Sequence, residues 1–359
     1  MISSYGVLGG AELAMDAFLA HRPAGVDARV LLLTDGPVRD RLQAQGLGVA
    51  AAHGMEGKPD PVRAARFTRP LLRDLRERRP DVVWAIGQKA ALLALPACRA
   101  LGVPLVWHKV DFSWDRTLSR PLAAAVDGVV AVSHAVTEPL GPWRGRRLLG
   151  VVGVPITLPD DPPSQRPEPG DPVIGTLGRL LPYKGHHHIL RAAALLSDEF
   201  PRLRVVLAGG PVKEFPDYPD ELRALAAELG LADRVELPGF VGDIAGVLRR
   251  LTVFVSATYR DEQGFGMEAL GAGIIEASWT GVPAVAVALG GTAESVLDGR
   301  TGTLVAEADP ALLATAIAAY LRDPGLRARA GEEGRRFARE GFAPEAAAGR
   351  LFDALARVV

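Results

Sequence analysis

Residues 173–196 read VIGTLGRLLPYKGHHHILRAAALL, and this run has the order strand, loop, helix. A strand is predicted over 173–177, where β-branched and aliphatic residues continue up to a glycine. A helix is predicted over 189–196, where leucine, isoleucine and alanine recur at helical spacing. The loop between them carries Arg179 and Lys184. This order is the repeating unit of parallel α/β folds, so the run predicts that fold class.

The same alternation extends in both directions along the chain. Further strands are predicted at 28–33, 81–86, 103–107, 128–132, 205–208, 235–237, 253–255 and 284–287, with helix-like stretches such as 90–101 between them. A segment rich in proline, 155–172, interrupts the pattern and reads as a linker. We therefore predict two similar α/β domains, at 1–155 and 172–340, joined by a linker at 156–171. The natural ligand site in such a protein is the cleft between the domains.

Length and composition narrow the class of protein. The chain has 359 residues, which suits two domains of about 150 residues each. Its formal net charge is −1, which argues against a nucleic-acid partner. Cys98 is the only cysteine, the first residues resemble no secretory signal, and no apolar run reaches the ~18 residues of a membrane span. These features predict a cytoplasmic protein.

The loop at 178–185 is a candidate phosphate site. Arg179 and Lys184 follow a strand end, and an arginine fork with a lysine point charge suits a pyrophosphate. The alternative is a solvated basic loop. The adjacent histidines 186–188 point in different directions on a helix, so we interpret them as a surface segment or helix start rather than a metal site.

A pair of glutamates gives a stronger signal. Glu268 and Glu276 are separated by seven residues, with glycines between them. If Gly271 opens a helix, Glu268 lies in the preceding loop and Glu276 lies inside the helix, while the amides of Leu270 and Gly271 point at an anion. From the spacing alone, two solvated glutamates on a helix face stay an alternative.

The first half of the chain carries weaker candidates. Gly9 and Gly10 precede a helix, where backbone amides approach a phosphate or a sugar hydroxyl, or form an ordinary loop. His108 ends the predicted strand at 103–107 and would point into the cleft; the alternative is a hydrogen-bonded loop histidine. The turns at 290–294 and 298–302 are interpreted as structural.

Taken together, these motifs resemble glycosyltransferase family 4, the retaining transferases of the two-domain GT-B fold. The motifs that match occur in the family's order: the glycine loop at 9–12, His108, the run Ala131-Val132-Ser133, Gly178-Arg179-Leu180 with Lys184-Gly185, Glu268 with Glu276, and the turns at 290–294 and 298–302. The resemblance implies two facing Rossmann-like domains with parallel sheets and an interdomain cleft. It also implies that a helix in 341–359 crosses back to the first domain.

The family resemblance also implies roles. Arg179 and Lys184 would hold the diphosphate, Glu268 the donor sugar and Glu276 the ribose. Phe240 and Val241 would line the base pocket through backbone groups. The full donor-binding set is Gly9, Gly10, Arg179, Lys184, Phe240, Val241, Glu268, Leu270, Gly271 and Glu276. The catalytic set is His108, Arg179, Lys184 and Glu268, and the acceptor side is Lys89, His108 and Asp111. No cofactor or metal is expected, because the basic pair supplies the electrostatic stabilisation.

The predicted function is retaining, metal-independent transfer of a sugar from a nucleotide sugar to a small-molecule, lipid or glycan acceptor, in bacterial natural-product (antibiotic), polysaccharide or envelope biosynthesis. The oligomeric state is a monomer or a homodimer. The alternatives are an inactive nucleotide-binding scaffold and a different GT-B enzyme such as an epimerase or phosphorylase. Two departures from the family are an insertion at 258–267 and the absence of its asparagine-glycine pair near 152–155. An arginine-rich stretch at 63–79, interrupted at Pro70, is interpreted as a solvated face, with contact to anionic lipid as the alternative.

Overall fold

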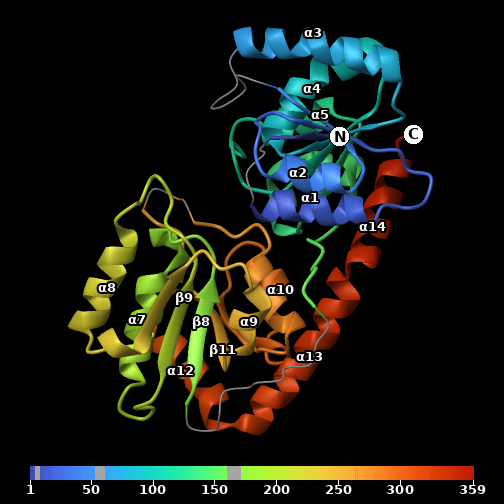
Figure 1. The fold of residues 1–359 in the computed structure, drawn as a ribbon. Helices are drawn as coiled ribbons and strands as arrows, with labels where there is room; N and C mark the ends of the chain where they lie inside the picture. Colours follow the sequence, from blue (N-terminus) through green and yellow to red (C-terminus); the bar gives the residue numbers. More distant parts are fainter. Residues whose placement is uncertain (5–8, 53–60, 160–170, 263, 265) are drawn as a thin grey trace. The chain divides into compact units, whose positions relative to one another are not determined.

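The computed structural model describes residues 1–4, 9–52, 61–159, 171–262, 264 and 266–359, with the backbone alone for 61–64 and 66. The chain forms two compact units. Unit 1 contains Met1–Thr157 and Gly341–Val359, and unit 2 contains Leu158–Glu340. Each unit is a parallel sheet with helices on both faces, as predicted (Figure 1). Most of the predicted linker, 160–170, lies outside the described residues.

Unit 1 contains a seven-stranded parallel sheet in the order β3-β2-β1-β4-β5-β6-β7. The strands are β1 (Ile2–Ser3), β2 (Arg29–Leu32), β3 (Gly48–Ala51), β4 (Val83–Ile86), β5 (Leu105–Lys109), β6 (Gly128–Ala131) and β7 (Leu148–Val151). Strand order reverses between β1 and β4, which are paired with each other. The carboxyl ends of strands at such a switch point are where open α/β sheets bind ligands.

The helices of unit 1 cover both faces of this sheet. They are α1 (Gly10–Ala20), α2 (Val38–Ala44), α3 (Pro61–Arg78), α4 (Gln88–Leu101), α5 (Ser119–Ala125), the 3-10 helix η1 (Ala135–Trp143), α6 (Arg144–Arg147) and α14 (Pro344–Ala356). One face packs on α3, α4 and α5, and the other packs on α1, α2 and α14 (Figure 1). Trp107 and Val106 are neighbours in β5 and belong to opposite cores, as alternating strand residues must.

Helix α3 corrects one expectation about the arginine-rich stretch. The helix runs through Pro70, although a proline in a helix interior removes a hydrogen bond and clashes with the preceding turn. Phe67, Leu71 and Leu75 recur at intervals of one turn and are all buried in the core, so packing holds the helix on both sides of the proline. The apolar stripe of this stretch is therefore used inside unit 1. In the described part of the chain, no helix is long and apolar enough to cross a bilayer.

Unit 2 contains a six-stranded parallel sheet in the order β10-β9-β8-β11-β12-β13. The strands are β8 (Val173–Leu177), β9 (Arg204–Ala208), β10 (Val235–Gly239), β11 (Val253–Ser256), β12 (Ala284–Val287) and β13 (Gly302–Val305). The order reverses between β8 and β11, so this pair forms the switch point of unit 2.

The helices of unit 2 also lie on both faces of their sheet. They are η2 (Pro182–Lys184), α7 (His186–Leu195), α8 (Tyr218–Glu228), η3 (Ala232–Arg234), α9 (Ile244–Arg249), α10 (Ala272–Trp279), α11 (Thr292–Ser295), α12 (Pro310–Arg322) and α13 (Pro324–Phe342). Helices α7, α8 and α12 pack on one face, and α9 and α10 pack on the other (Figure 1). The loops that follow β8 and β11 leave this sheet side by side at its carboxyl edge.

Candidate active site

The loop after β8 is pressed against the end of β11. Its residues 182–184 form the short helix η2, and Gly185 follows with φ 74°, in the left-handed region that favours glycine. A Cβ atom at Gly185 would lie 2.0 Å from the carbonyl oxygen of Ala257. Only glycine permits this approach, which brings Lys184 to the segment that leads from β11 to Glu268.

Lys184 and Glu268 form an ion pair at this point. The Lys184 ammonium donates a hydrogen bond to Glu268 Oε1, and Thr258 Oγ1 donates to the same oxygen at 3.0 Å. The side chains of Lys184 and Glu268 are 23% and 19% exposed, so a ligand can still reach them. The structure therefore brings together two residues that the sequence places 84 positions apart.

The pKa of Glu268 reflects this setting. Burial by itself raises the pKa, but the charge and hydrogen bond of Lys184, the hydrogen bond of Thr258 and the charge of Arg179 together lower it below its usual range. Glu268 is accordingly a carboxylate at neutral pH. Arg179 is itself exposed and lies close enough to contribute, so the predicted trio of Arg179, Lys184 and Glu268 acts as one electrostatic group.

The backbone around Glu268 is fixed by the glycine turn at 290–291. Gly291 N donates to Glu268 O at 2.7 Å, and Gly290 pairs with Glu268 in a parallel bridge. The Ser295 hydroxyl bonds the carbonyl oxygen of Leu270. The turn predicted as structural therefore positions the glutamate itself.

Helix α10 begins directly after Gly271, as predicted, and no side chain caps its first turn. Glu268 lies in the preceding loop and Glu276 lies inside the helix. Glu276 is half-buried, and burial raises its pKa to about 7. Within the described residues, no neighbouring charge or hydrogen bond contributes to that shift. A carboxylate of this kind has acceptor capacity for hydroxyl groups.

Phe240 and Val241 follow β10 and differ in their exposure. The ring of Phe240 is 82% exposed, while Val241 packs partly against the core beside α9 and α10. The sequence analysis predicted that backbone groups of both residues line the pocket for the nucleotide base. The structure adds an exposed aromatic ring, which can stack on a planar ligand.

His108 occupies a different position from the one predicted. It lies within β5 rather than after the strand, because β5 begins at Leu105 and extends through Lys109. Its ring is 3% exposed and packs between Phe18 and Trp84, with centroid distances of 6.1 and 5.8 Å. Neither ring nitrogen has a hydrogen-bond partner among the described residues, so the alternative of a hydrogen-bonded loop histidine is also wrong. Burial lowers its pKa to about 4, which keeps the imidazole neutral.

The glycine loop of unit 1 is described only in part, because residues 5–8 lie outside the described residues. Gly9 is the N-cap of α1 in extended conformation, with no side-chain cap, and Gly10 is the first helical residue. The predicted opening of a helix at this pair is therefore confirmed. Glu12 is buried in the first turn of the same helix.

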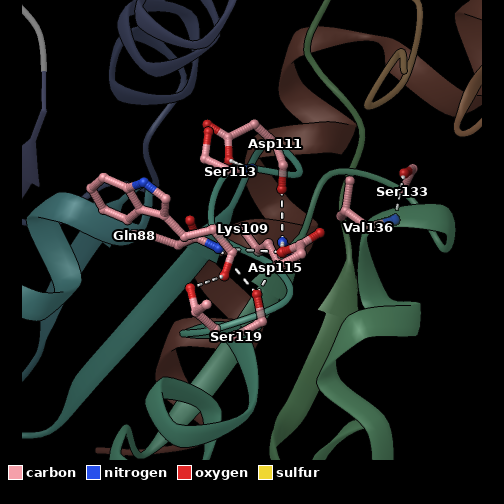
Figure 2. Close-up of polar contacts among 10 residues, drawn as sticks. Gln88, Lys109, Asp111, Ser113, Asp115, Ser119, Ser133 and Val136 are labelled. Carbon is pink, nitrogen blue, oxygen red and sulfur yellow. Dashed lines mark hydrogen bonds and ion pairs between the residues drawn. The ribbon is translucent and has the colours of Figure 1, made fainter. Parts of the chain in front are cut away.

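A buried polar cluster surrounds Lys109 at the carboxyl end of β5 (Figure 2). The Lys109 side chain is 1% exposed and donates to Asp115 Oδ1 at 2.5 Å and to the carbonyl oxygen of Asp111 at 2.7 Å. Ser119 Oγ donates to the same Asp115 oxygen at 2.5 Å, and Gln88 Nε2 contacts both Ser119 and Asp115, at 3.1 and 3.3 Å. Burial lowers the pKa of Lys109, and Asp115 opposes that effect.

The two remaining acceptor-side candidates, Asp111 and Lys89, lie in or next to this cluster. The carbonyl oxygen of Asp111 accepts a hydrogen bond from Lys109, and its side-chain Oδ1 accepts one from the amide of Ser113 at 2.9 Å. Lys89 is buried in the first turn of α4, next to Gln88. Lys89 thus follows β4 and Asp111 follows β5, and both lie at the carboxyl edge of the sheet.

The sequence analysis did not predict two groups of residues that the structure places at these sites. Thr258 holds Glu268 but sits inside the insertion, where no family motif marks it. One sequence signal points to the set Gln88, Lys109, Asp115 and Ser119: Lys109 is one of only five lysines in the chain, and it ends a strand. Among the described residues, no group of three or more His, Cys, Asp or Glu side chains is arranged to hold a metal ion.

Comparison with known proteins identifies the family. The profile described as glycosyl transferases group 1 matches residues 159–337, and that of glycosyltransferase family 4 matches residues 9–147. The D-inositol 3-phosphate glycosyltransferase of Acidothermus cellulolyticus is 33% identical over 310 residues, which cover 75% of this chain and 66% of that protein. The enzyme of the same name from Streptomyces avermitilis is 40% identical over 167 residues, covering 45% of this chain and 34% of that protein. This chain thus spans between about a third and two thirds of these relatives.

Solved structures share the whole fold. The crystal structure of Anabaena Alr3699/HepE in complex with UDP and glucose superimposes with a TM-score of 0.81 and covers 99% of both chains at 23% identity. Because the two profiles together account for most of the chain and the fold is that of such structures, the chain belongs to glycosyltransferase family 4 and has the GT-B fold.

Proposed function

We propose that the protein is a retaining glycosyltransferase that uses a nucleoside-diphosphate sugar. The observation that carries this proposal is the pairing of Lys184 with Glu268, beside Arg179, at the switch point between β8 and β11. Two cations and a carboxylate at that position match the needs of a diphosphate and of the sugar attached to it. The relatives named above are glycosyltransferases, and HepE was crystallised with UDP and glucose, which supports the same donor class.

Each donor-site residue binds a different part of the nucleotide sugar. Arg179 and Lys184 bind the diphosphate; the hydrogen bond to Glu268 uses one of the three donors of the Lys184 ammonium. Glu268 accepts hydroxyls of the sugar, and Glu276 accepts hydroxyls of the ribose. The amides of Leu270 and Gly271 face the phosphate, and Phe240 with Val241 borders the base.

The reaction follows from these contacts. The acceptor oxygen forms a bond to the anomeric carbon, and the bond from that carbon to the diphosphate oxygen breaks. The acceptor proton passes to the departing diphosphate on the same face of the sugar, so the configuration is retained. Arg179 and Lys184 stabilise the charge that develops on the leaving group. We propose that this needs no metal ion.

In this proposal, residues of unit 1 bind the acceptor. Its acceptor-side residues, Lys89, His108 and Asp111, lie near the carboxyl edge of the seven-stranded sheet, around its switch point. The names of the relatives point to a phosphorylated polyol as the first acceptor to test, in bacterial envelope or natural-product biosynthesis. We propose a cytoplasmic location and a monomer or homodimer.

A transfer assay tests this function. The full-length protein is incubated with UDP-, GDP-, ADP- and dTDP-glucose, with D-inositol 3-phosphate as acceptor and EDTA present. We expect one donor to release its nucleoside diphosphate and to give an α-glucoside, identified by the anomeric coupling constant in proton NMR. A β-linked product would contradict retention. Tight nucleotide binding without turnover of any donor or acceptor would favour the inactive scaffold.

A further inference from the structure

The structure brings together two features of the sequence that the candidate donor site does not use. They are the histidines 186–188 and residues 259 and 260 of the insertion at 258–267. His187 and His188 pack edge-on against the ring of Tyr259, with centroid distances of 5.6 and 5.1 Å. The backbone amide of Tyr259 donates to Tyr183 O at 2.9 Å, which anchors the start of the insertion beside η2. Of the two interpretations of these histidines, the helix start is confirmed, because α7 begins at His186. The surface segment is wrong for His186, which is buried.

This junction borders a pocket of about 440 Å³ within unit 2. The pocket lies at the carboxyl ends of β11, β12 and β13, with His188 of α7 and the start of α12 on its border. Arg179, Lys184, Glu268 and Glu276 are not among its lining residues, so its lining is distinct from that of the candidate donor site. Its volume falls in the usual range of about 300–1,000 Å³ for small-molecule sites.

Side chains of both charges border the pocket. Arg260 disfavours a cation, and Glu307 and Asp309 disfavour an anion. Asp309 Oδ1 is already used, since it caps α12 by accepting from the amides of Ala311 and Leu312 at 2.8 and 3.0 Å. The two signs therefore face one small volume, and a neutral ligand avoids repulsion from either.

The remaining lining favours a ligand with many hydroxyl groups. Tyr259 and Leu289 supply apolar surface, and His188 Nδ1 is buried without a hydrogen-bond partner among the described residues. Burial and the nearby Arg191 lower the pKa of His188, against the opposing charge of Asp309, so the ring is neutral and can both donate and accept. Hydroxyl groups can donate to the carboxylates and accept from the guanidinium, which an apolar ligand cannot do.

We propose that this pocket binds an uncharged hexose unit, at a carbohydrate site separate from the donor site. The inference does not depend on catalysis, because it concerns binding to unit 2 alone. The hexose would contact Arg260, Glu307 and His188 through hydroxyl groups and Tyr259 and Leu289 through its C–H faces.

Saturation-transfer NMR with the full-length protein tests the proposal. The probes are methyl α-D-glucopyranoside and methyl α-D-mannopyranoside, with glucosamine and methyl glucuronide as cationic and anionic comparisons. Ala306→Trp fills the pocket from an exposed position, and Arg260→Gln removes the guanidinium. Ala319→Trp is the matched control, because Ala319 is an exposed alanine of α12 that does not line the pocket.

We expect a neutral glycoside to bind the wild type and the Ala319→Trp control equally. Affinity should fall about tenfold or more in Ala306→Trp and clearly in Arg260→Gln, with glucosamine and the glucuronide binding more weakly than the neutral probes. The absence of glycoside binding to the wild type, or unchanged binding in both pocket variants, would overturn the proposal. Tighter binding of either charged probe would also overturn it.

Discussion

Replacing Lys184 by methionine is expected to lower kcat/KM for sugar transfer about 10²–10³-fold, the effect of removing one charged donor from a developing oxyanion. Methionine preserves most of the volume of the side chain and removes only its charge and donors. The side chain of Lys184 is 23% exposed, so the substitution should leave cooperative unfolding of unit 2 intact. Steady-state kinetics with the donor and acceptor from the transfer assay provide the measurement.

The control for this variant is Lys213→Met, which removes an exposed lysine of the same unit. It should leave kcat/KM unchanged. Glu268→Gln provides a second check, because it disrupts the other half of the ion pair and should also impair transfer. Full activity in Lys184→Met would remove Lys184 from the site.

Replacing Asp115 by alanine is expected to destabilise unit 1 by about 3–5 kcal/mol, because it leaves the buried charge of Lys109 without its partner. Neutral Lys109 costs less to bury than the ammonium. Since burial already lowers the pKa of Lys109, the destabilisation should become smaller as the pH rises from neutrality toward the lysine's unfolded pKa of about 10.4. Hydrogen exchange of peptides from β4 and β5 in increasing urea reports on unit 1 separately from unit 2.

Two controls isolate the buried charge as the cause. In the double variant Asp115→Ala with Lys109→Met, no charge is left buried, and most of the stability should return. Asp74→Ala breaks an exposed pair on α3, where Arg78 and Asp74 are 44% and 50% exposed, and should cost less than about 1 kcal/mol. A double variant no more stable than Asp115→Ala would show that the charge of Lys109 is not the reason.

Most central strands could be predicted from the sequence, whereas of the edge strands only β10 could. Strand β4 is buried at every position, which produces the continuous apolar run expected of a parallel strand covered on both faces. The outer strands β3 and β7 contain glycine and are only partly buried, so their pattern does not stand out. Their positions depend on pairing with β2 and β6, which is a property of the assembled sheet.

The site shows the same division. The order of motifs predicted Arg179, Lys184, Glu268 and Glu276, because the two basic residues follow a strand and the two glutamates flank the start of a helix. The sequence could not reveal that Lys184 bonds Glu268, since that contact depends on how closely Gly185 approaches Ala257. Nor could it reveal the burial of Lys109, whose partner Asp115 reaches it only through the loop after β5. In both cases the missing information is a long-range contact.

The most direct test of the central claim is thermal unfolding of the full-length protein with UDP, GDP, ADP and dTDP, in EDTA. The measurement is best made at pH 8, above the pKa of about 7 that burial gives Glu276. A nucleotide present at 100 times its dissociation constant should add about 2.7 kcal/mol to the stability of the unit that binds it. The account predicts that one of the four stabilises unit 2, that Arg179→Ala and Glu276→Gln weaken this effect, and that Arg223→Ala on the exposed side of α8 does not. Stabilisation by none of the nucleotides, or stabilisation unchanged in both site variants, would contradict it.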